Sequence, residues 1–255
     1  MAYAQSQGVP VVQTKAKPYS MDENMMHISY EAGILEDPAQ AAPADMFRMT
    51  TDPRAAPSEP VTLRVHFERG LPVRVQNLAD GTDLSAGPSG SALALYEYLN
   101  RVGGAHGVGR MDVVENRFVG IKSRGVYETP AAEVLRQAHM GLEGLTLDRE
   151  VFRLRDMLSA KFAEYAYNGF WFSPEMEFVL AAVEKSQERV TGSCDVQLFK
   201  GRAAIAARAS PLSLYNPKMS SMDEGGGWNP QDSTGFIRIN AVRLVAHARR
   251  EAALK

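Results

Sequence analysis

The stretch Val114-Glu-Asn-Arg-Phe-Val-Gly-Ile-Lys-Ser-Arg-Gly-Val-Tyr-Glu-Thr129 carries many hydrogen-bonding side chains between small apolar steps. A buried strand would be mostly apolar, and a surface strand would alternate cleanly, whereas this stretch does neither. Gly120 and Gly125 allow the backbone to bend or to approach another group closely. Charges of both signs lie together, which suits a ligand carrying both an ammonium and a carboxylate. The alternative is a solvated loop whose charges pair with one another.

The strand pattern is simpler elsewhere in the chain. Apolar and polar residues alternate over 61–68 with a period of two, which predicts a half-buried strand. Gly70 then turns the chain into a second strand, so a β-hairpin is expected. Residues 194–209 predict two more strands around Lys200-Gly201. Because strands cluster between helical blocks without a βα rhythm, we expect an α+β fold with a mostly antiparallel sheet packed with helices.

Helices are predicted over residues 91–102, 130–145, 148–166 and 174–192. In the longest, apolar residues recur at spacings of three and four and predict a core-facing stripe: Val151, Leu154, Leu158, Phe162 and Tyr165. In the first, Leu93, Tyr96 and Leu99 are expected to share the inward face. Ser20 is followed three residues later by Glu23, which is the spacing of a capping box, so a helix is also expected to begin there.

Bulk composition restricts the class of protein. The 255 residues are enough for a sizeable core, with 45% hydrophobic and 23% charged residues. The net charge of −2 gives no reason to expect nucleic acid or an anionic membrane as a partner. The single cysteine, Cys194, allows no intrachain disulfide and is expected in the core. Without a run of about 18 apolar residues or a secretory pattern, a cytoplasmic protein is expected.

Both ends of the sequence have helical patterns. Residues 1–8 are typical of a helix tail that ends at Gly8, so we expect the chain to start inside a longer ancestral sequence, with a short strand at 9–12. At the other end, a loop around Gly225-Gly-Gly227 precedes an amphipathic helix over 234–253. Its apolar rows need a surface to lie on. Packing onto its own domain is an alternative that periodicity alone leaves open.

Three runs of sequence together resemble the argininosuccinate synthase family. They are Pro18-Tyr-Ser-Met-Asp-Glu-Asn-Met-Met-His-Ile-Ser-Tyr-Glu-Ala-Gly-Ile-Leu-Glu-Asp-Pro38, the stretch from Glu115 to Pro130, and Tyr167-Asn-Gly-Phe-Trp-Phe-Ser-Pro174. The resemblance extends over essentially all of residues 1–255 and corresponds to the carboxyl-terminal part of the family's enzyme. That family begins with a nucleotide-binding domain opening on a Ser-Gly-Gly-Leu-Asp-Thr-Ser phosphate loop, and this sequence contains no such run.

The resemblance implies an ATP-dependent ligase that joins citrulline to aspartate, giving argininosuccinate, AMP and pyrophosphate. ATP, with Mg, is a co-substrate of the full enzyme. The ureido oxygen of citrulline becomes an adenylate, and the amine of aspartate then displaces AMP. No covalent enzyme intermediate forms, so the chemistry demands positioning and charge stabilisation rather than a catalytic nucleophile. The sequence accordingly has no recognisable nucleophile motif, and no catalytic or metal-binding residue is expected.

Four citrulline contacts are implied by the resemblance, each within one of the matching runs: Ser20, Ser29, Glu115 and Tyr127. A carboxylate can accept from an ammonium, and hydroxyls satisfy the remaining groups of a small polar ligand. The alternatives are Ser20 as a helix cap, Ser29 as a loop hydroxyl, Glu115 as an ion-pair partner of Arg117 or Arg124, and Tyr127 as an aromatic at the edge of the core. The resemblance favours the ligand role for all four.

The resemblance also divides the chain. Residues 1–17 are a remnant of the junction with the nucleotide-binding domain, residues 18–232 the citrulline-binding synthetase domain, and residues 233–255 a protruding C-terminal oligomerisation helix of a homotetramer. The family's contacts to ATP and aspartate lie in the amino-terminal domain, so this chain alone is not expected to bind ATP by that route. Three interpretations remain: the synthetase part of the enzyme, a non-catalytic assembly or regulatory subunit, or an amino-acid-binding module.

Overall fold

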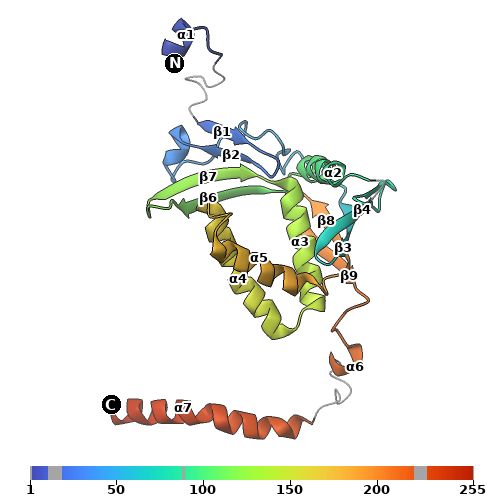
Figure 1. Cartoon of the computed structure of the whole chain (residues 1–255), viewed down its shortest axis with the longest axis vertical. Helices are drawn as coiled ribbons and strands as arrows, with labels where there is room; N and C mark the ends of the chain where they lie inside the picture. The colour runs from blue at the N-terminus through green and yellow to red at the C-terminus, as the bar shows by residue number, and fades with distance from the viewer. Residues whose placement is uncertain (1, 11–18, 88–89, 221–228, 255) are drawn as a thin grey trace. The chain divides into compact units, whose positions relative to one another are not determined.

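The computed structural model describes residues 2–10, 19–87, 90–220 and 229–254. Its contacts divide the chain into two compact units, Met1–Leu214 and Tyr215–Lys255. The described strands all lie in the first unit and form two antiparallel sheets beside helices (Figure 1). The predicted α+β fold with antiparallel sheets is therefore confirmed. The predicted domain boundaries at 17/18 and 232/233 stay predictions.

The larger sheet has the order β5-β4-β3-β8-β9, with bounds Asp83–Ser85, Leu71–Asn77, Val61–Glu68, Gly192–Phe199 and Arg202–Ala209. Both predicted hairpins, at Gly70 and at Lys200-Gly201, are confirmed. The alternation in β3 buries every second side chain. These side chains pack with α2 (Ala92–Ala105) and α3 (Pro130–Thr146) into the main core. Cys194 is fully buried there, as predicted, and burial raises the pKa of its thiol to about 11.

The inward face of α2 differs from the prediction. Leu95, Tyr98 and Leu99 are buried, whereas Leu93 is 54% exposed. Leu93, Tyr96 and Leu99 are three residues apart, and such a row moves gradually around a helix with 3.6 residues per turn. The buried residues stand at positions i, i+3 and i+4, which is the pattern of a single helix face. Ser91 caps the start of the helix, because its hydroxyl oxygen accepts a hydrogen bond from the backbone N–H of Ala94.

The smaller sheet has the order β1-β2-β7-β6, with bounds Ser20–Glu23, Ile28–Glu31, Lys122–Glu128 and Arg110–Asn116. The quoted polar stretch thus supplies most of a β-hairpin, β6 and β7. One face of the sheet is apolar and packs against the short helix η1 (Gly33–Glu36) and the connection that follows it. As predicted, residues 37–60 form no regular helix or strand. The other face carries polar side chains and positions the candidate site.

The helix predicted to begin at Ser20 is wrong, since Ser20–Glu23 is the edge strand β1. Ser20 pairs with Glu31 and Glu23 with Ile28 of β2, which in turn pairs with β7. The capping-box pattern is local, whereas the strand is stabilised by a ladder with residues farther along the chain. The helix tail before Gly8 is confirmed as α1 (Ala2–Ser6), with Gly8 at a φ of 65°. The strand predicted at 9–12 extends beyond the described residues.

Helices α4 (Arg149–Tyr167) and α5 (Pro174–Gln187) pack against one another as a helical hairpin. The apolar stripe predicted on α4 is only partly covered, because Val151 and Leu154 are 40% and 59% exposed. Its other members are half-buried: Leu158, Phe162 and Tyr165. The buried residue of α4 is instead Arg155. Its guanidinium pairs with the buried carboxylate of Glu143 on α3, and the Gln187 amide donates to that carboxylate at 2.9 Å. A buried polar cluster therefore joins the three helices.

The second unit consists of α6 (Pro217–Ser220), the short helix η2 (Pro230–Asp232) and α7 (Ser233–Ala253). The predicted final helix is confirmed, and none of its side chains is buried. The predicted loop around Gly225-Gly-Gly227 lies outside the described residues.

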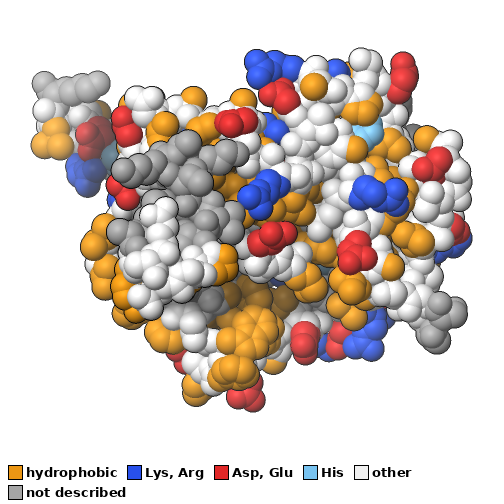
Figure 2. Space-filling model, turned by 90° about the horizontal axis from the view of Figure 1, so that it is seen from above, with side chains coloured by type: hydrophobic (Ala, Val, Ile, Leu, Met, Phe, Trp, Pro, Cys, Tyr) orange, Lys and Arg blue, Asp and Glu red, His pale blue; other side chains and the backbone are white. Residues whose placement is uncertain are grey.

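Surface charge on the chain is mixed. On the face seen in Figure 2, basic and acidic side chains lie among each other and among apolar ones. This mixture agrees with the small net charge of −2.

Candidate functional site

The pairing of the four-stranded sheet brings all four predicted site residues to one face. Ser29 lies opposite Tyr127, Ser20 opposite Glu31, and Glu115 opposite Ser123. Residues opposite each other in antiparallel strands point to the same side. From the polar stretch, Glu115, Ser123 and Tyr127 therefore lie on the side away from the buried Ile28 and Tyr30. Arg124 and Glu128 alternate with them and lie on the other side.

Three of the four predicted residues line one pocket of about 480 Å³: Ser29, Glu115 and Tyr127. His27, Glu31, Arg117 and Tyr167 complete its lining. Ser20 does not belong to this lining, because it lies on β1, at the opposite edge of the sheet from the β6 strand that carries Glu115. The sheet therefore brings together Ser29, Glu115 and Tyr127, and it places Ser20 on the same face but apart from them.

Glu115 is held by hydroxyl groups from two different elements. The phenol of Tyr127 on β7 donates to Oε2 at 2.9 Å, and the phenol of Tyr167 at the end of α4 donates to Oε1 at 3.1 Å. Burial and the hydrogen bond to Glu115 hold the pKa of the Tyr127 phenol well above its usual range. Both phenols therefore stay protonated and act as donors. Each oxygen of the carboxylate keeps acceptor capacity toward the pocket.

Gly125 allows Tyr127 to reach Glu115. The two residues are on the same face of β7, and the ring of Tyr127 lies across Gly125. A β-carbon at position 125 would lie 2.7 Å from the Tyr127 hydroxyl oxygen, which is closer than real contacts allow. The glycine in the polar stretch thus permits a close approach, as predicted, and the group that approaches is a side chain of the site.

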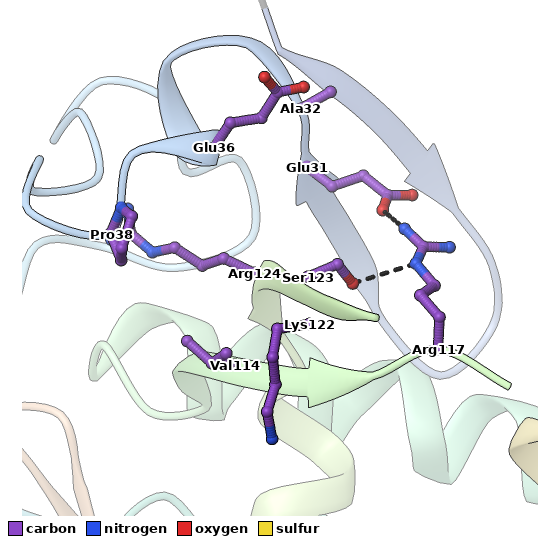
Figure 3. A pocket seen from close by; sticks show the side chains of 9 residues that line it. All are labelled: Glu31, Ala32, Glu36, Pro38, Val114, Arg117, Lys122, Ser123 and Arg124. Atoms are coloured by element: carbon purple, nitrogen blue, oxygen red, sulfur yellow. Dashed lines mark hydrogen bonds and ion pairs between the residues drawn. The ribbon is translucent and has the colours of Figure 1, made fainter. Parts of the chain in front are cut away.

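Arg117 follows β6 and neutralises a second carboxylate. Its guanidinium pairs with Glu31 at 2.7 Å and donates to the Ser123 hydroxyl at 3.0 Å (Figure 3). The charge of Glu31 raises the pKa of Arg117 further. Because Arg117 is bound to Glu31, the ion-pair alternative for Glu115 is not the arrangement found. These residues also line an adjoining pocket of about 380 Å³, together with Glu36, Lys122 and Arg124.

Sequence reasoning assigned no role to Tyr167, Glu31 or His27, although all three belong to the quoted runs, and it considered Arg117 only as a partner of Glu115. His27 packs edge-on against Tyr127, with ring centroids 5.3 Å apart. The alternation of β2 and the residue before it gives His27, Ser29 and Glu31 the same parity, which could have indicated His27 and Glu31. No local signal indicates that Tyr167 reaches the sheet, since that depends on where α4 ends.

Among the described residues, no group of three or more His, Cys, Asp or Glu side chains could hold a metal ion. No helix within the described part of the chain is both long and apolar enough to span a membrane.

The fold and the site define an α+β domain that presents a polar pocket on one face of an antiparallel sheet. Comparison with known proteins identifies one family. The model of the arginosuccinate synthase C-terminal domain matches residues 19–247. The chain belongs to the argininosuccinate synthase family.

Curated relatives named argininosuccinate synthase cover almost the whole chain. The protein from Thermotoga maritima is 58% identical over 245 residues, which is 96% of this chain and 59% of the relative. The proteins from Bos taurus and Homo sapiens are 53% and 51% identical over 249 residues, which is 98% of this chain and 59% of each relative. The chain therefore spans about three fifths of the length of these relatives.

Proposed function

We propose that this chain provides the citrulline-binding side of an argininosuccinate synthase, through Ser29, Glu115 and Tyr127, with Ser20 on the same sheet face. The observation that carries the proposal is the Glu115 carboxylate, fixed between two phenol hydroxyls in a pocket that Ser29 also lines. The family and the name shared by the relatives support it.

The charges of the pocket favour a ligand with an ammonium group. Its lining contains two carboxylates, Glu31 and Glu115, and one guanidinium, Arg117. Arg117 pairs with Glu31, so Glu115 is left with neutral hydrogen-bond donors only. An α-ammonium group supplies the missing positive charge and a charge-assisted hydrogen bond. The hydroxyls of Ser29 and Tyr127 can serve the remaining polar groups of citrulline.

In the proposed reaction the ureido oxygen of citrulline attacks the α-phosphorus of ATP. An oxygen–phosphorus bond forms, the bond to the β-phosphate breaks, and pyrophosphate leaves. The amine of aspartate then attacks the ureido carbon, AMP leaves with the ureido oxygen, and the amine loses a proton. ATP with Mg, and aspartate, are proposed to be bound by the nucleotide-binding domain of the family's enzyme. The role of this chain is to hold citrulline in a reactive position.

Calorimetric titration of the chain with citrulline tests the proposal, and Glu115→Gln is the decisive variant. The substitution removes the negative charge and one acceptor, so citrulline affinity should fall about 10- to 150-fold, equivalent to about 1.5–3 kcal/mol. Glu23→Gln is the matched control, because Glu23 is an exposed residue at the edge of the same sheet.

The proposal is supported if the wild-type chain binds citrulline, Glu115→Gln binds it more weakly, and Glu23→Gln binds it with wild-type affinity. Equal affinity of Glu115→Gln and wild type would show that Glu115 does not contact the ligand. Pyrophosphate release when the chain is supplied with the nucleotide-binding domain distinguishes the enzyme from a non-catalytic subunit or a simple binding module.

Gly125→Ala provides a second test that changes no charge. The new methyl group must displace the Tyr127 ring, and the hydroxyl then leaves Glu115. A side chain at the surface of a pocket can move at small cost, so we expect about tenfold weaker citrulline binding with little change in the melting temperature. Gly144→Ala is the control, because a β-carbon there has no neighbour within 4 Å. If Gly125→Ala binds citrulline normally, the position of Tyr127 is not important for binding.

A further inference from the structure

The last residue of α4 reaches the candidate site from outside the sheet. Tyr167 donates its hydroxyl hydrogen to Oε1 of Glu115, while Tyr127 donates to Oε2. Tyr127 follows Glu115 by 12 residues in the same hairpin, whereas Tyr167 follows it by 52. The orientation of the Glu115 carboxylate is therefore fixed jointly by the sheet and by a helix distant in sequence.

The end of α4 is itself fixed against the β6–β7 hairpin. The chain turns after the helix at Gly169, which has a φ of 80°, and the Phe170 N–H donates to the Tyr165 carbonyl at 2.8 Å. This turn directs Phe170 to the hairpin, where its ring packs edge-on against Phe118 with centroids 5.9 Å apart. The contact between Tyr167 and Glu115 thus has an apolar contact beside it.

The body of α4 is also anchored. Arg155 is 9% exposed and pairs with the buried Glu143 of α3. Gln187 of α5 donates to the same carboxylate, and His139 of α3 lies 2.8 Å from the Gln187 amide oxygen. Tyr167 is therefore carried by a helix with a fixed position, which is a more rigid support than a loop.

Tyr167 also lines two hollows of the surface. It lines the pocket of about 480 Å³ that contains Ser29 and Tyr127, and the neighbouring pocket of about 460 Å³ that contains Phe118 and Ala163. Glu115 and Arg117 are shared by both pockets. The Tyr167 side chain is 49% exposed, so part of the ring remains available to a ligand.

We propose that Tyr167 is a further positioning residue of the citrulline site, which orients the Glu115 carboxylate from α4. The inference rests on the proposed function, because it assumes that Glu115 binds the ligand. It adds to that function a residue outside the sheet and makes the position of the α4–α5 hairpin a determinant of substrate binding.

Tyr167→Phe is the test variant and Tyr165→Phe its control. Phenylalanine keeps the ring and removes only the hydroxyl. Tyr165 is on the same helix, two residues away, and does not line the pocket. Calorimetric titration of the chain with citrulline should show about fivefold weaker binding for Tyr167→Phe, because one partly exposed hydrogen bond to a charged group is lost. Tyr165→Phe should bind as wild type, and both variants should melt within a degree or two of each other.

A spectroscopic signature distinguishes positioning from mere structural support. The chain is prepared with ¹³C at the ζ carbon of tyrosine, and the two variants assign the Tyr167 and Tyr165 signals by their disappearance. Citrulline should shift the Tyr167 signal and leave the Tyr165 signal in place. Glu115→Gln should move the Tyr167 signal in the absence of ligand, since the acceptor has changed.

The outcomes separate the inference from the proposed function. If the wild-type chain binds citrulline and Tyr167→Phe binds it equally well, the inference is overturned while the proposed function stands. A loss of affinity without a citrulline-dependent shift of the Tyr167 signal also overturns it, because the role is then structural. A wild-type chain that does not bind citrulline overturns the proposed function and this inference with it.

Discussion

Replacing Glu128 by alanine is expected to lower the free energy of unfolding by about 3–5 kcal/mol. Glu128 is the last residue of β7 and is fully buried. Its Oε2 accepts the Tyr30 hydroxyl at 2.7 Å and the Arg48 N–H at 2.8 Å. Its Oε1 accepts the backbone N–H and the hydroxyl of Thr50 and the N–H of Met49. One carboxylate thus satisfies five donors.

The cost arises from the donors that alanine leaves without a partner. Each buried N–H or O–H group that is left without an acceptor lowers the stability of the fold by about 1–3 kcal/mol. In the described structure, the N–H groups of residues 48–50 donate to no carboxylate other than Glu128. Arg110 extends the network, since its Nε donates to the Thr50 hydroxyl at 2.7 Å. The buried carboxylate therefore fixes the irregular connection to the sheet that carries the site.

Urea unfolding followed by circular dichroism measures this effect, with Glu59→Ala as the control. Glu59 is an exposed glutamate of the same connection, so its replacement should change stability by less than about 0.5 kcal/mol. Glu128→Gln should be intermediate, because the amide keeps one acceptor oxygen but turns N–H groups toward backbone donors. A Glu128→Ala protein as stable as the control would mean that water replaces the carboxylate in this site.

The strands that sequence predicted well are those whose pattern is produced locally. In β3, alternate residues are buried against α2 and α3, so the period of two is visible in the sequence itself. Ser20–Glu23 is different, because its strand depends on pairing with β2 and, through it, with β7. Local capping chemistry at Ser20 pointed to a helix, and the non-local ladder determined the outcome.

Helix positions were predicted better than the surfaces that helices use. The periodicity of α4 gave the correct element, but its apolar stripe is only partly covered and its fully buried residue is an arginine. A hydrophobic period shows that one side of a helix is apolar, and it does not show what covers that side. The buried pair of Arg155 and Glu143 joins two successive helices through residues 12 positions apart and has no periodic signal.

For the site, the residue types came from the resemblance and the arrangement came from strand register. Ser29 and Tyr127 are neighbours because β2 pairs with β7. Glu115 lies on the same face because it pairs with Ser123, and the side chains of Ser123 and Tyr127 point to the same side of β7. Tyr167 could not be predicted, because its contact with Glu115 depends on the turn at Gly169 and on the docking of Phe170.

Deleting residues 234–255 is expected to shift the solution mass from a tetramer toward a dimer or monomer. Assembly through this helix is a proposal that rests on the apolar surface of α7. Its large apolar side chains are strongly exposed: Phe236 71%, Ile237 61%, Ile239 76%, Val242 66%, Leu244 51% and Val245 45%. An isolated helix of this length is marginal in water and gains stability chiefly by packing an apolar side. A neighbouring subunit can provide that surface.

The distribution of these side chains around α7 favours more than one contact surface. Ile237 and Leu244 form one row with Ala241 and Ala248, and Val242 and Val245 lie beside it. At 100° per residue, Ile239 points away from the Ile237 row and lies on the far side of Val242. A helix that buries only one side against its own domain would leave such a residue in water. Apolar residues on several sides suit a helix that lies between neighbouring subunits.

Light scattering over a range of protein concentrations measures the mass, because assembly follows mass action. Two point variants sharpen the test: Leu244→Glu places a charge in the apolar row, and Arg243→Glu places the same residue on the polar side of the helix. Leu244→Glu should dissociate the assembly as the deletion does, since an unpaired charge in an apolar contact costs several kcal/mol. Arg243→Glu should leave the mass unchanged. A tetramer that survives both the deletion and Leu244→Glu would show that assembly uses other surfaces, and the exposed apolar residues Val151 and Leu154 of α4 would then be the next to test.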